Sequence, residues 1–238
     1  MADIIKKINQ LLGIKESYQA PAKMMEIITS DERETYFNQF LEAFDYDVNY
    51  YWFHEYFQEE HAERKTKKQD FTPKSISRLM NHIVGNHQGS YYEPAAGTGG
   101  ILIERWHQDR LQVSPFEYEP RMYYYEAEEL SDRTIPFLLF NMMIRGMNGT
   151  VVQCDVLTRE AYGAWFIQND NNDHMQFSSL NRLPYSKWTE KELNVKFIEQ
   201  NYAEVKQTED IPQWLAENLQ TQYDNDTSFI QKARHQVN

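Results

Sequence analysis

The sequence has few of the features of secreted and membrane proteins, namely cysteines and long apolar runs. One cysteine, Cys154, occurs in 238 residues, so no disulfide can form within the chain. A lone cysteine is usually a buried packing residue, and we expect that role for Cys154 rather than a nucleophilic one. No apolar run approaches the roughly 20 residues of a membrane helix. The amphipathic N-terminus also lacks the long apolar stretch of a signal peptide. We therefore expect a soluble protein of the cytoplasm with no membrane partner.

Positive charge is scarce as well. Lys and Arg number 24 against 36 Asp and Glu, which gives a net charge of −12. Because contacts from lysine and arginine to phosphates supply most of the affinity for nucleic acids, a chain this acidic is expected to bind DNA weakly on its own. The densest basic run is RKTKK at residues 64–68. It is interpreted either as a solvated linker or as an edge that contacts phosphates.

Metal-binding patterns are missing too. His54, Glu55 and His61 lie close together without forming the HExxH pattern of zinc enzymes. The polar run IQNDNNDHMQ, residues 167–176, has the acids of a calcium loop but lacks its glycine and its terminal glutamate. We expect no metal site and interpret this run as a loop.

The first third of the chain shows helical patterns. Apolar residues recur at helical spacing over residues 2–14, and Gly13 is a suitable end for that helix. Ser30 with the acids after it predicts the N-cap of a second helix. The aromatic stretch at 45–61 predicts a third helix. We assign residues 1–68 to an N-terminal helical region and residues 69–238 to an α/β domain.

The α/β domain alternates strands and helices. The predicted strands are 90–92, 121–130 and 149–157, and the predicted helices between them are 99–108 and 134–144. This order predicts a parallel sheet with right-handed crossovers. After the loop we expect a fourth strand within 175–188, a fifth at 194–200 and a helix at 211–220.

The stretch EPAAGTGG, residues 93–100, joins the first of these strands to its helix. Glycine has no Cβ and adopts positive φ readily, so a ligand can approach the backbone of such a turn closely. The helix that follows offers unpaired N–H groups at its N-terminus. The turn is not a P-loop, since Gly100 is followed by Ile101 rather than by lysine, and Leu102 stands where the dinucleotide-binding pattern needs a glycine.

Three further elements accompany the turn: Phe71-Thr72-Pro73 about twenty residues before it, Glu129 followed by a helix with Asn141 and Gly146, and Asp155-Val156-Leu157. Together these four elements resemble the S-adenosylmethionine-dependent N6-adenine DNA methyltransferases, in particular the modification subunits of type I restriction-modification systems. The resemblance covers roughly residues 55–190. It implies a Rossmann-like methyltransferase sheet, mostly parallel, that binds S-adenosyl-L-methionine.

The resemblance also implies a role for each matching residue. Glu93 would hold the methionine amino group, Glu129 the ribose hydroxyls, Asp155 the adenine amine and Thr72 the cofactor carboxylate. Glu126 and Glu128 remain alternatives for the ribose acid. The implied cofactor site consists of Phe71, Thr72, Pro73, Glu93, Pro94, Ala95, Gly97, Thr98, Gly99, Gly100, Glu129, Asp155 and Leu157.

The expected catalytic motif departs from the family. Members carry Asn/Asp-Pro-Pro-Phe/Tyr, whose amide and carbonyl accept from the target amine while the aromatic ring stacks on the flipped base. Here the run is NRLPYS, with Asn181, Pro184 and Tyr185 as the candidate catalytic residues. Arg182 occupies the place of the asparagine, and arginine has only donors. Either Asn181 reaches the amine through a shifted turn, or methyl transfer is lost.

Two functions are therefore expected. The first is an adenine-N6 DNA methyltransferase that depends on partner subunits for DNA, because the roughly fifty residues after NRLPYS leave no room for a target-recognition domain. The second is an inactive relative that keeps the cofactor fold and binds or regulates a restriction or defence protein, as a phage or mobile element would encode. The acidic charge favours a protein partner over free DNA.

Overall fold

The computed structural model describes residues 2–53, 56–57, 75–76, 79–80 and 89–208, and the structural statements below concern these residues. Residues 1–207 form one compact unit. Of the second unit, residues 208–238, only Thr208 is among the described residues. The predicted helix at 211–220, the Phe71-Thr72-Pro73 element and the proposed boundary after residue 68 also lie outside. None of the described helices is long and apolar enough to cross a bilayer.

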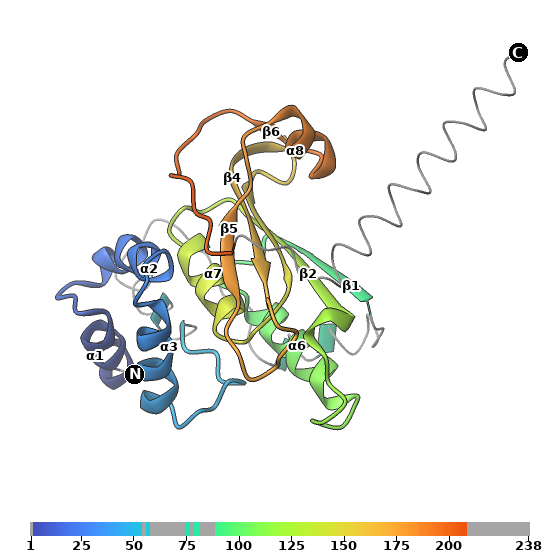
Figure 1. Cartoon of the computed structure of the whole chain (residues 1–238). Coiled ribbons are helices and arrows are strands. Elements are labelled where there is room, and N and C mark those ends of the chain that lie inside the picture. Colours follow the sequence, from blue (N-terminus) through green and yellow to red (C-terminus); the bar gives the residue numbers. More distant parts are fainter. Residues whose placement is uncertain (1, 54–55, 58–74, 77–78, 81–88, 209–238) are drawn as a thin grey trace, which may run out of the picture. The chain divides into compact units, whose positions relative to one another are not determined.

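A six-stranded sheet organises the unit, in the order β1-β2-β3-β4-β5 with β6 paired to β4 (Figure 1). The strands are β1 Gly89–Pro94, β2 Tyr123–Glu129, β3 Gly149–Cys154, β4 Glu160–Gln168, β5 Ser179–Arg182 and β6 Lys196–Phe197. The first three strands are parallel, whereas β4 is antiparallel to both β3 and β5. The mostly parallel α/β sheet expected from the sequence is confirmed.

The two predicted crossover helices are present as α6 Gly100–Leu111 and α7 Ile135–Met143. The chain steps from β1 to β2 to β3 in one direction, so right-handed crossovers place both helices on the same face of the sheet. All nine residues of α7 are buried. A helix that is apolar all round needs cover on every side, and here the sheet and the N-terminal helices supply it.

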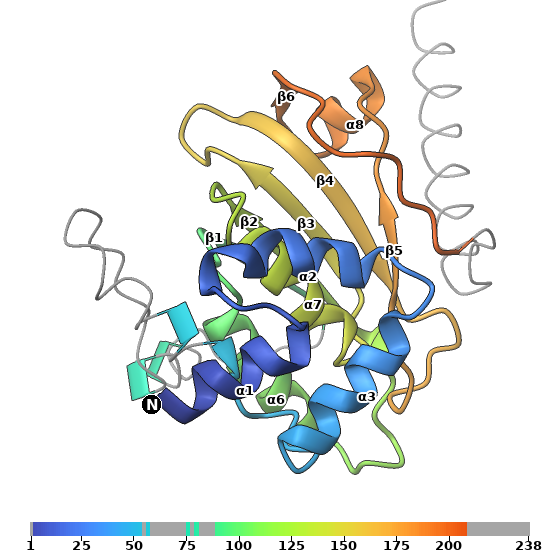
Figure 2. The same ribbon diagram turned by 90° about the vertical axis from the view of Figure 1, so that its left-hand side faces the viewer.

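The N-terminal helices are α1 Ala2–Leu12, α2 Ala20–Ile28 and α3 Arg33–Ala43. Figure 2 shows them on the α7 side of the sheet. Their aromatic residues pack on the middle of α7: the ring of Phe140 lies 5.1 Å from Phe37 and 4.8 Å from Phe40. Burying such large rings contributes strongly to the stability of a core. The N-terminal helices and the sheet therefore share one hydrophobic core.

The start of the second predicted helix differs from expectation. The hydroxyl of Ser30 donates to the carbonyl of Ile27 and ends α2, which the sequence did not predict, while α3 begins at Arg33. The prediction of a third helix is wrong for residues 45–51, which form turns in the structure. Asp45 and Tyr46 have φ of 55° and 57° there, a conformation that a helix cannot include.

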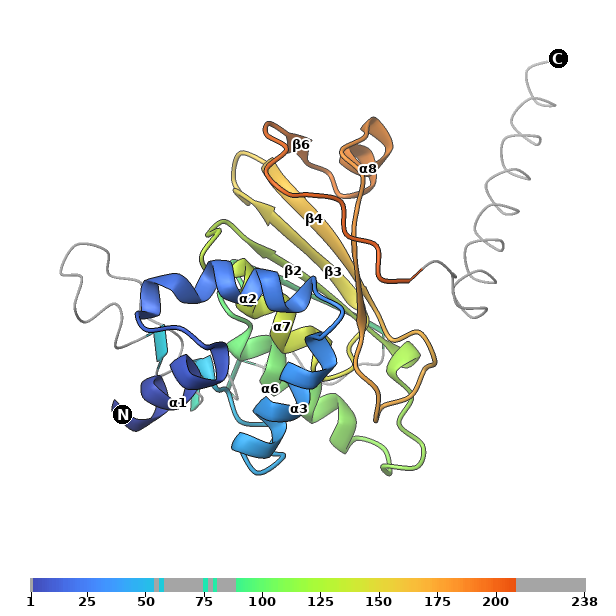
Figure 3. The same ribbon diagram turned by 60° about the vertical axis from the view of Figure 1, so that its left-hand side comes forward.

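The second half of the sheet also differs. The long strand β4 was not predicted, and its C-terminal end takes in residues 167 and 168 of the predicted loop. The predicted fourth and fifth strands correspond to the short strands β5 and β6. Figure 3 shows β6 and the helix α8, Lys187–Glu192, beside the end of the sheet where β4 begins.

Cys154 is buried at the end of β3 with 1% of its surface exposed. Burial, with the nearby Glu128 carboxylate, raises the pKa of its thiol to about 12. We expect no reaction with a thiol reagent in the folded chain at pH 8, because the thiolate is the reactive form. One equivalent should react after unfolding in urea. Fast reaction of the folded chain would contradict the packing role.

Candidate functional site

The glycine turn begins where β1 ends, and the structure ties it to the end of β2. Ala95 and Gly97 have φ of 57° and 59°, and Gly99, at 90°, precedes the first turn of α6. The N–H of Ala96 donates to the carbonyl of Glu128 at 2.8 Å. The backbone therefore folds back over the neighbouring strand before the helix starts.

Of the three candidate ribose acids, Glu129 contacts the turn. One oxygen of its carboxylate accepts from the N–H of Gly97 at 2.8 Å, and the other accepts from the N–H of Ser131 at 2.8 Å. Each carboxylate oxygen can accept a further hydrogen bond. Glu129 therefore has the capacity to accept two vicinal hydroxyls next to the glycine turn.

Glu128 points to the opposite face of the sheet and is engaged there. Both its oxygens accept from the guanidinium of Arg159 at 2.7 Å, and the hydroxyl of Tyr92 donates to it at 2.8 Å. Burial alone would raise the pKa of Glu128, but these hydrogen bonds outweigh burial and lower it. A carboxylate paired in this way is poorly placed to accept from a ligand.

Glu93, at the end of β1, is a buried acid with 7% of its surface exposed. Its carboxyl accepts a hydrogen bond from Tyr91 at 3.4 Å. Burial raises the pKa of Glu93 to about 8, and this hydrogen bond opposes the rise only in part. No cation pairs with it among the described residues. A buried carboxyl of this kind fits a ligand that brings an ammonium group.

Asp155 follows the end of β3. Its Oδ1 accepts from the N–H groups of Leu157 and Thr158 at 2.8 and 3.1 Å, which leaves Oδ2 to accept from a ligand. The side chain of Leu157 is 91% exposed. Because β1, β2 and β3 are parallel, Glu93, Glu129 and Asp155 all lie at the same edge of the sheet.

The candidate catalytic residues lie elsewhere. Asn181 is on β5, separated from β1 by three strands. The residues paired in register across the sheet are Tyr92, Glu126, Thr150, Phe166 and Asn181. With a strand spacing of about 4.8 Å, the backbone of Asn181 lies roughly 19 Å from β1. The structure thus brings the cofactor candidates of three strands together and leaves Asn181 apart from them.

The side chains of NRLPYS have partners of their own. The amide oxygen of Asn181 accepts from the N–H of Gln207 at 3.1 Å, and the hydroxyl of Tyr185 donates to the carbonyl of Tyr162 at 2.9 Å. The Tyr185 ring packs edge-on against Phe197 at 4.7 Å, and Arg182 lies over its face at 4.6 Å. These contacts engage both Asn181 and Tyr185 and place a guanidinium over one face of the Tyr185 ring.

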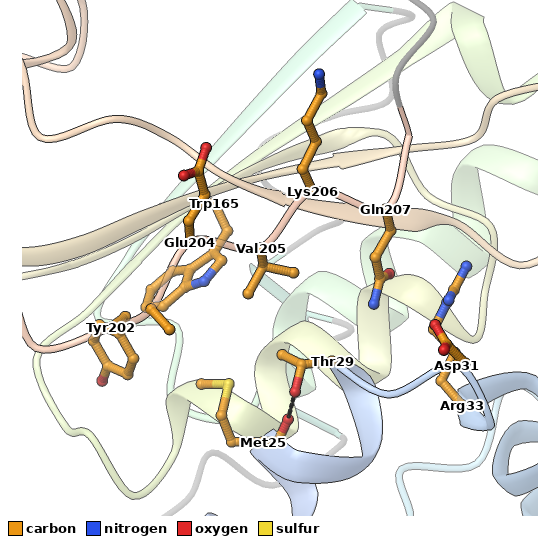
Figure 4. Close-up of a pocket in the computed structure, with 11 residues that line it drawn as sticks. Met25, Thr29, Asp31, Arg33, Trp165, Tyr202, Glu204, Val205, Lys206 and Gln207 are labelled. Carbon is orange, nitrogen blue, oxygen red and sulfur yellow. Dashed lines mark hydrogen bonds between the residues drawn. The ribbon is translucent and has the colours of Figure 1, made fainter.

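Two cavities lie away from the glycine turn. One of about 590 Å³ is formed by α2, Trp165 and the segment 202–207, and Figure 4 shows Met25, Thr29 and Val205 facing it. The other, of about 630 Å³, lies between α2 and the N-terminus of α7. Neither is lined by a residue of the implied cofactor site. The described residues also contain no cluster of three His, Cys, Asp or Glu side chains that could hold a metal.

Residues 50–236 match the sequence profile of the N-6 DNA methylase family. The chain belongs to that family. Curated proteins and solved structures gave no match. N-6 DNA methylases modify DNA, so the membership implies a DNA adenine methyltransferase-like function and an interaction with DNA. The family resemblance seen in the sequence is confirmed, and the role of each residue stays a proposal.

The structure adds two residues that the sequence did not single out, Tyr51 and Arg145. Tyr51 and Asn141 hydrogen-bond to Thr98 in the middle of the glycine turn, and Arg145 donates to the side chain of Asn141. Asn141 was part of the family resemblance, whereas Tyr51 lies 47 residues before Thr98 and no local pattern marks it.

Proposed function

We propose that this N-6 DNA methylase family member binds S-adenosyl-L-methionine at the carboxyl ends of β1, β2 and β3, and that NRLPYS does not carry out methyl transfer. The observation that supports binding most strongly is the contact between Glu129 and Gly97, because it joins the proposed ribose acid of β2 to the turn after β1. Ligands of open α/β sheets bind at this edge, beyond the carboxyl ends of the strands.

The residues present fit the cofactor. Glu93 would pair with the methionine ammonium, Glu129 would accept the ribose hydroxyls, and Oδ2 of Asp155 would accept from the adenine amine. Gly97, Thr98, Gly99 and Gly100, with Pro94 and Ala95 before them, shape the turn. The cofactor supplies a methyl group on a positively charged sulfur, and the acids at this edge are of the sign that attracts it.

The position of Asn181 supports the second half of the proposal. A catalytic group must lie within hydrogen-bond reach of the atom it acts on, and β5 is two strand intervals from β3 and four from β1, which is beyond that reach in both cases. The chain would then act as a cofactor-holding binding or regulatory protein. Its charge of −12 favours a protein partner, such as a subunit of a restriction or defence system, over free DNA.

Calorimetric titration with S-adenosyl-L-methionine tests the binding. We expect one site per chain with a dissociation constant in the micromolar range, equivalent to about −8 kcal/mol. Absence of heat and of any thermal stabilisation at millimolar cofactor would refute the proposal. Adenosine triphosphate is the matched control ligand, since the turn lacks a lysine for its phosphates.

A further inference from the structure

Thr98, in the middle of the glycine turn, is completely buried and held from two sides. The hydroxyl of Tyr51 shares a hydrogen bond with its Oγ1. On the other side, the amide of Asn141 on α7 donates to its carbonyl at 2.8 Å. The turn that begins the cofactor site is therefore tied to a residue of the N-terminal region.

The position of Tyr51 is fixed by Arg145, which is buried with 4% of its surface exposed. Its guanidinium donates to the carbonyls of Val48 at 2.9 Å and Tyr50 at 3.0 Å, and to the side-chain oxygen of Asn141 at 2.9 Å. It also lies over the ring of Trp52 at 4.7 Å. One side chain thus anchors the backbone just before Tyr51, lies over the ring of the residue after it, and also orients Asn141.

The Tyr51 ring lies against the start of α6. A Cβ added to Gly100 would come within 2.8 Å of Cε1 of that ring, so Gly100 lets the ring pack there. Burial raises the pKa of Tyr51, and the charge of Glu93 contributes to the rise. The Tyr51 hydroxyl is therefore within electrostatic reach of the Glu93 carboxyl as well as hydrogen-bonded to Thr98.

We infer that Tyr51 is a further residue of the cofactor site, where its hydroxyl binds the amino-acid end of S-adenosyl-L-methionine beside Glu93 and Thr98. Arg145 and Asn141 are the positioning residues that hold it there. The inference rests on the proposed function, because it assigns a contact at the same site. It implies that the N-terminal region contributes to specificity for the methionine part of the cofactor.

The test compares two ligands that differ at that end only. S-adenosylhomocysteine carries the amino acid, whereas methylthioadenosine has the same nucleoside and thioether without it. In the full chain, Tyr51→Phe is expected to weaken S-adenosylhomocysteine about ten- to hundredfold, the usual effect of losing a hydrogen bond to a charged group. Methylthioadenosine should bind as it does to the wild type, within about twofold. Tyr46→Phe, which removes an exposed hydroxyl from the same segment, is the matched control and should change neither affinity.

The ratio of the two ligand affinities within one variant distinguishes a direct contact between Tyr51 and the ligand from an effect of Tyr51 on the shape of the turn. An equal loss for both ligands would mean that Tyr51 only shapes the turn, and no loss for either would mean that it plays no part. Both results overturn the inference while leaving the proposed function standing. If the wild type binds neither of these ligands nor S-adenosyl-L-methionine, the proposed function itself fails.

Discussion

Replacing Glu93 by glutamine is expected to weaken S-adenosyl-L-methionine binding by about a hundredfold or more. The change keeps the shape of the side chain and removes the charge that would pair with the methionine ammonium, and breaking a buried pair costs several kcal/mol. With a pKa of about 8, the carboxyl is mostly protonated at pH 7 in the free chain. Binding should therefore release about one proton, and calorimetry in buffers of different ionisation enthalpy measures that release directly.

The same substitution is expected to stabilise the folded chain. The pKa of Glu93 is about 8 when the chain is folded and near the ordinary 4.5 of a glutamate when it is unfolded, so the folded state keeps a proton that the unfolded state loses. The stability that this group contributes is full below about pH 4.5 and falls as the pH rises to about 8. At pH 7 the loss is on the order of 3 kcal/mol, and Glu93→Gln removes it.

Glu126→Gln is the matched control for the effect on cofactor binding. Glu126 lies on the neighbouring strand, is exposed, and points to the opposite face of the sheet. It should leave cofactor affinity and proton release unchanged. If Glu93→Gln binds the cofactor as tightly as the wild type, the buried acid is not the partner of the ammonium group.

Replacing Asp109 by alanine is expected to destabilise the chain by about 3–5 kcal/mol. Its carboxylate accepts from Nε of Arg105 at 2.9 and 3.0 Å and from the hydroxyl of Tyr125 at 2.9 Å, so it joins α6 to β2. Both ionised side chains are at least 96% buried. Burial raises the pKa of Asp109 despite these partners, which indicates that the pair itself adds little. The cost of Asp109→Ala comes from leaving Arg105 buried without its carboxylate.

A double variant separates these two contributions. Arg105→Met combined with Asp109→Leu should recover most of the lost stability in urea unfolding, because apolar groups of similar volume often replace a buried pair without loss. Glu119→Ala breaks an exposed pair with Arg121 and should cost less than about 1 kcal/mol. A double variant as unstable as Asp109→Ala would show that the pair itself contributes strongly.

The first half of the sheet could be predicted from sequence because its signals are local. Short apolar strands, the turn at Gly97 and Gly99, and an unbroken apolar run at 135–140 predict β1, α6, β2, α7 and β3 to within a few residues. Glu129 could be selected from its position at the end of a strand. Choosing it over Glu128 required the structure, since the two differ in which face of the sheet they occupy.

The strand β4 could not be predicted because both of its faces are largely buried, so apolar and polar residues do not alternate along it. Gly163 interrupts it, and glycine in a strand interior normally argues against one. The structure gives the reason for this glycine: a Cβ there would come within 2.7 Å of the Tyr202 ring and 2.8 Å of Trp165. The contact with Tyr202 comes from a segment about forty residues later in the chain, and no local pattern can reveal it.

The position of NRLPYS in the sheet is decided by the strand with which β4 pairs. Because β4 pairs with β3 and not with β1, the next strand extends the sheet away from the glycine turn. The spacing of motifs along the sequence is the same whether the strand falls beside β1 or beyond β3. Only the strand order separates a complete catalytic site from a cofactor site with Asn181 on the far side.

The fate of a labelled methyl group tests most directly whether cofactor binding and methyl transfer are separated in this chain. The chain is incubated with S-adenosyl-L-methionine carrying a tritiated methyl group and with adenine-rich DNA of mixed sequence, and protein and DNA are then separated. We predict label bound reversibly to the protein and none in N6-methyladenine of the DNA. Label in N6-methyladenine that depends on Asn181 and Tyr185 would contradict the account.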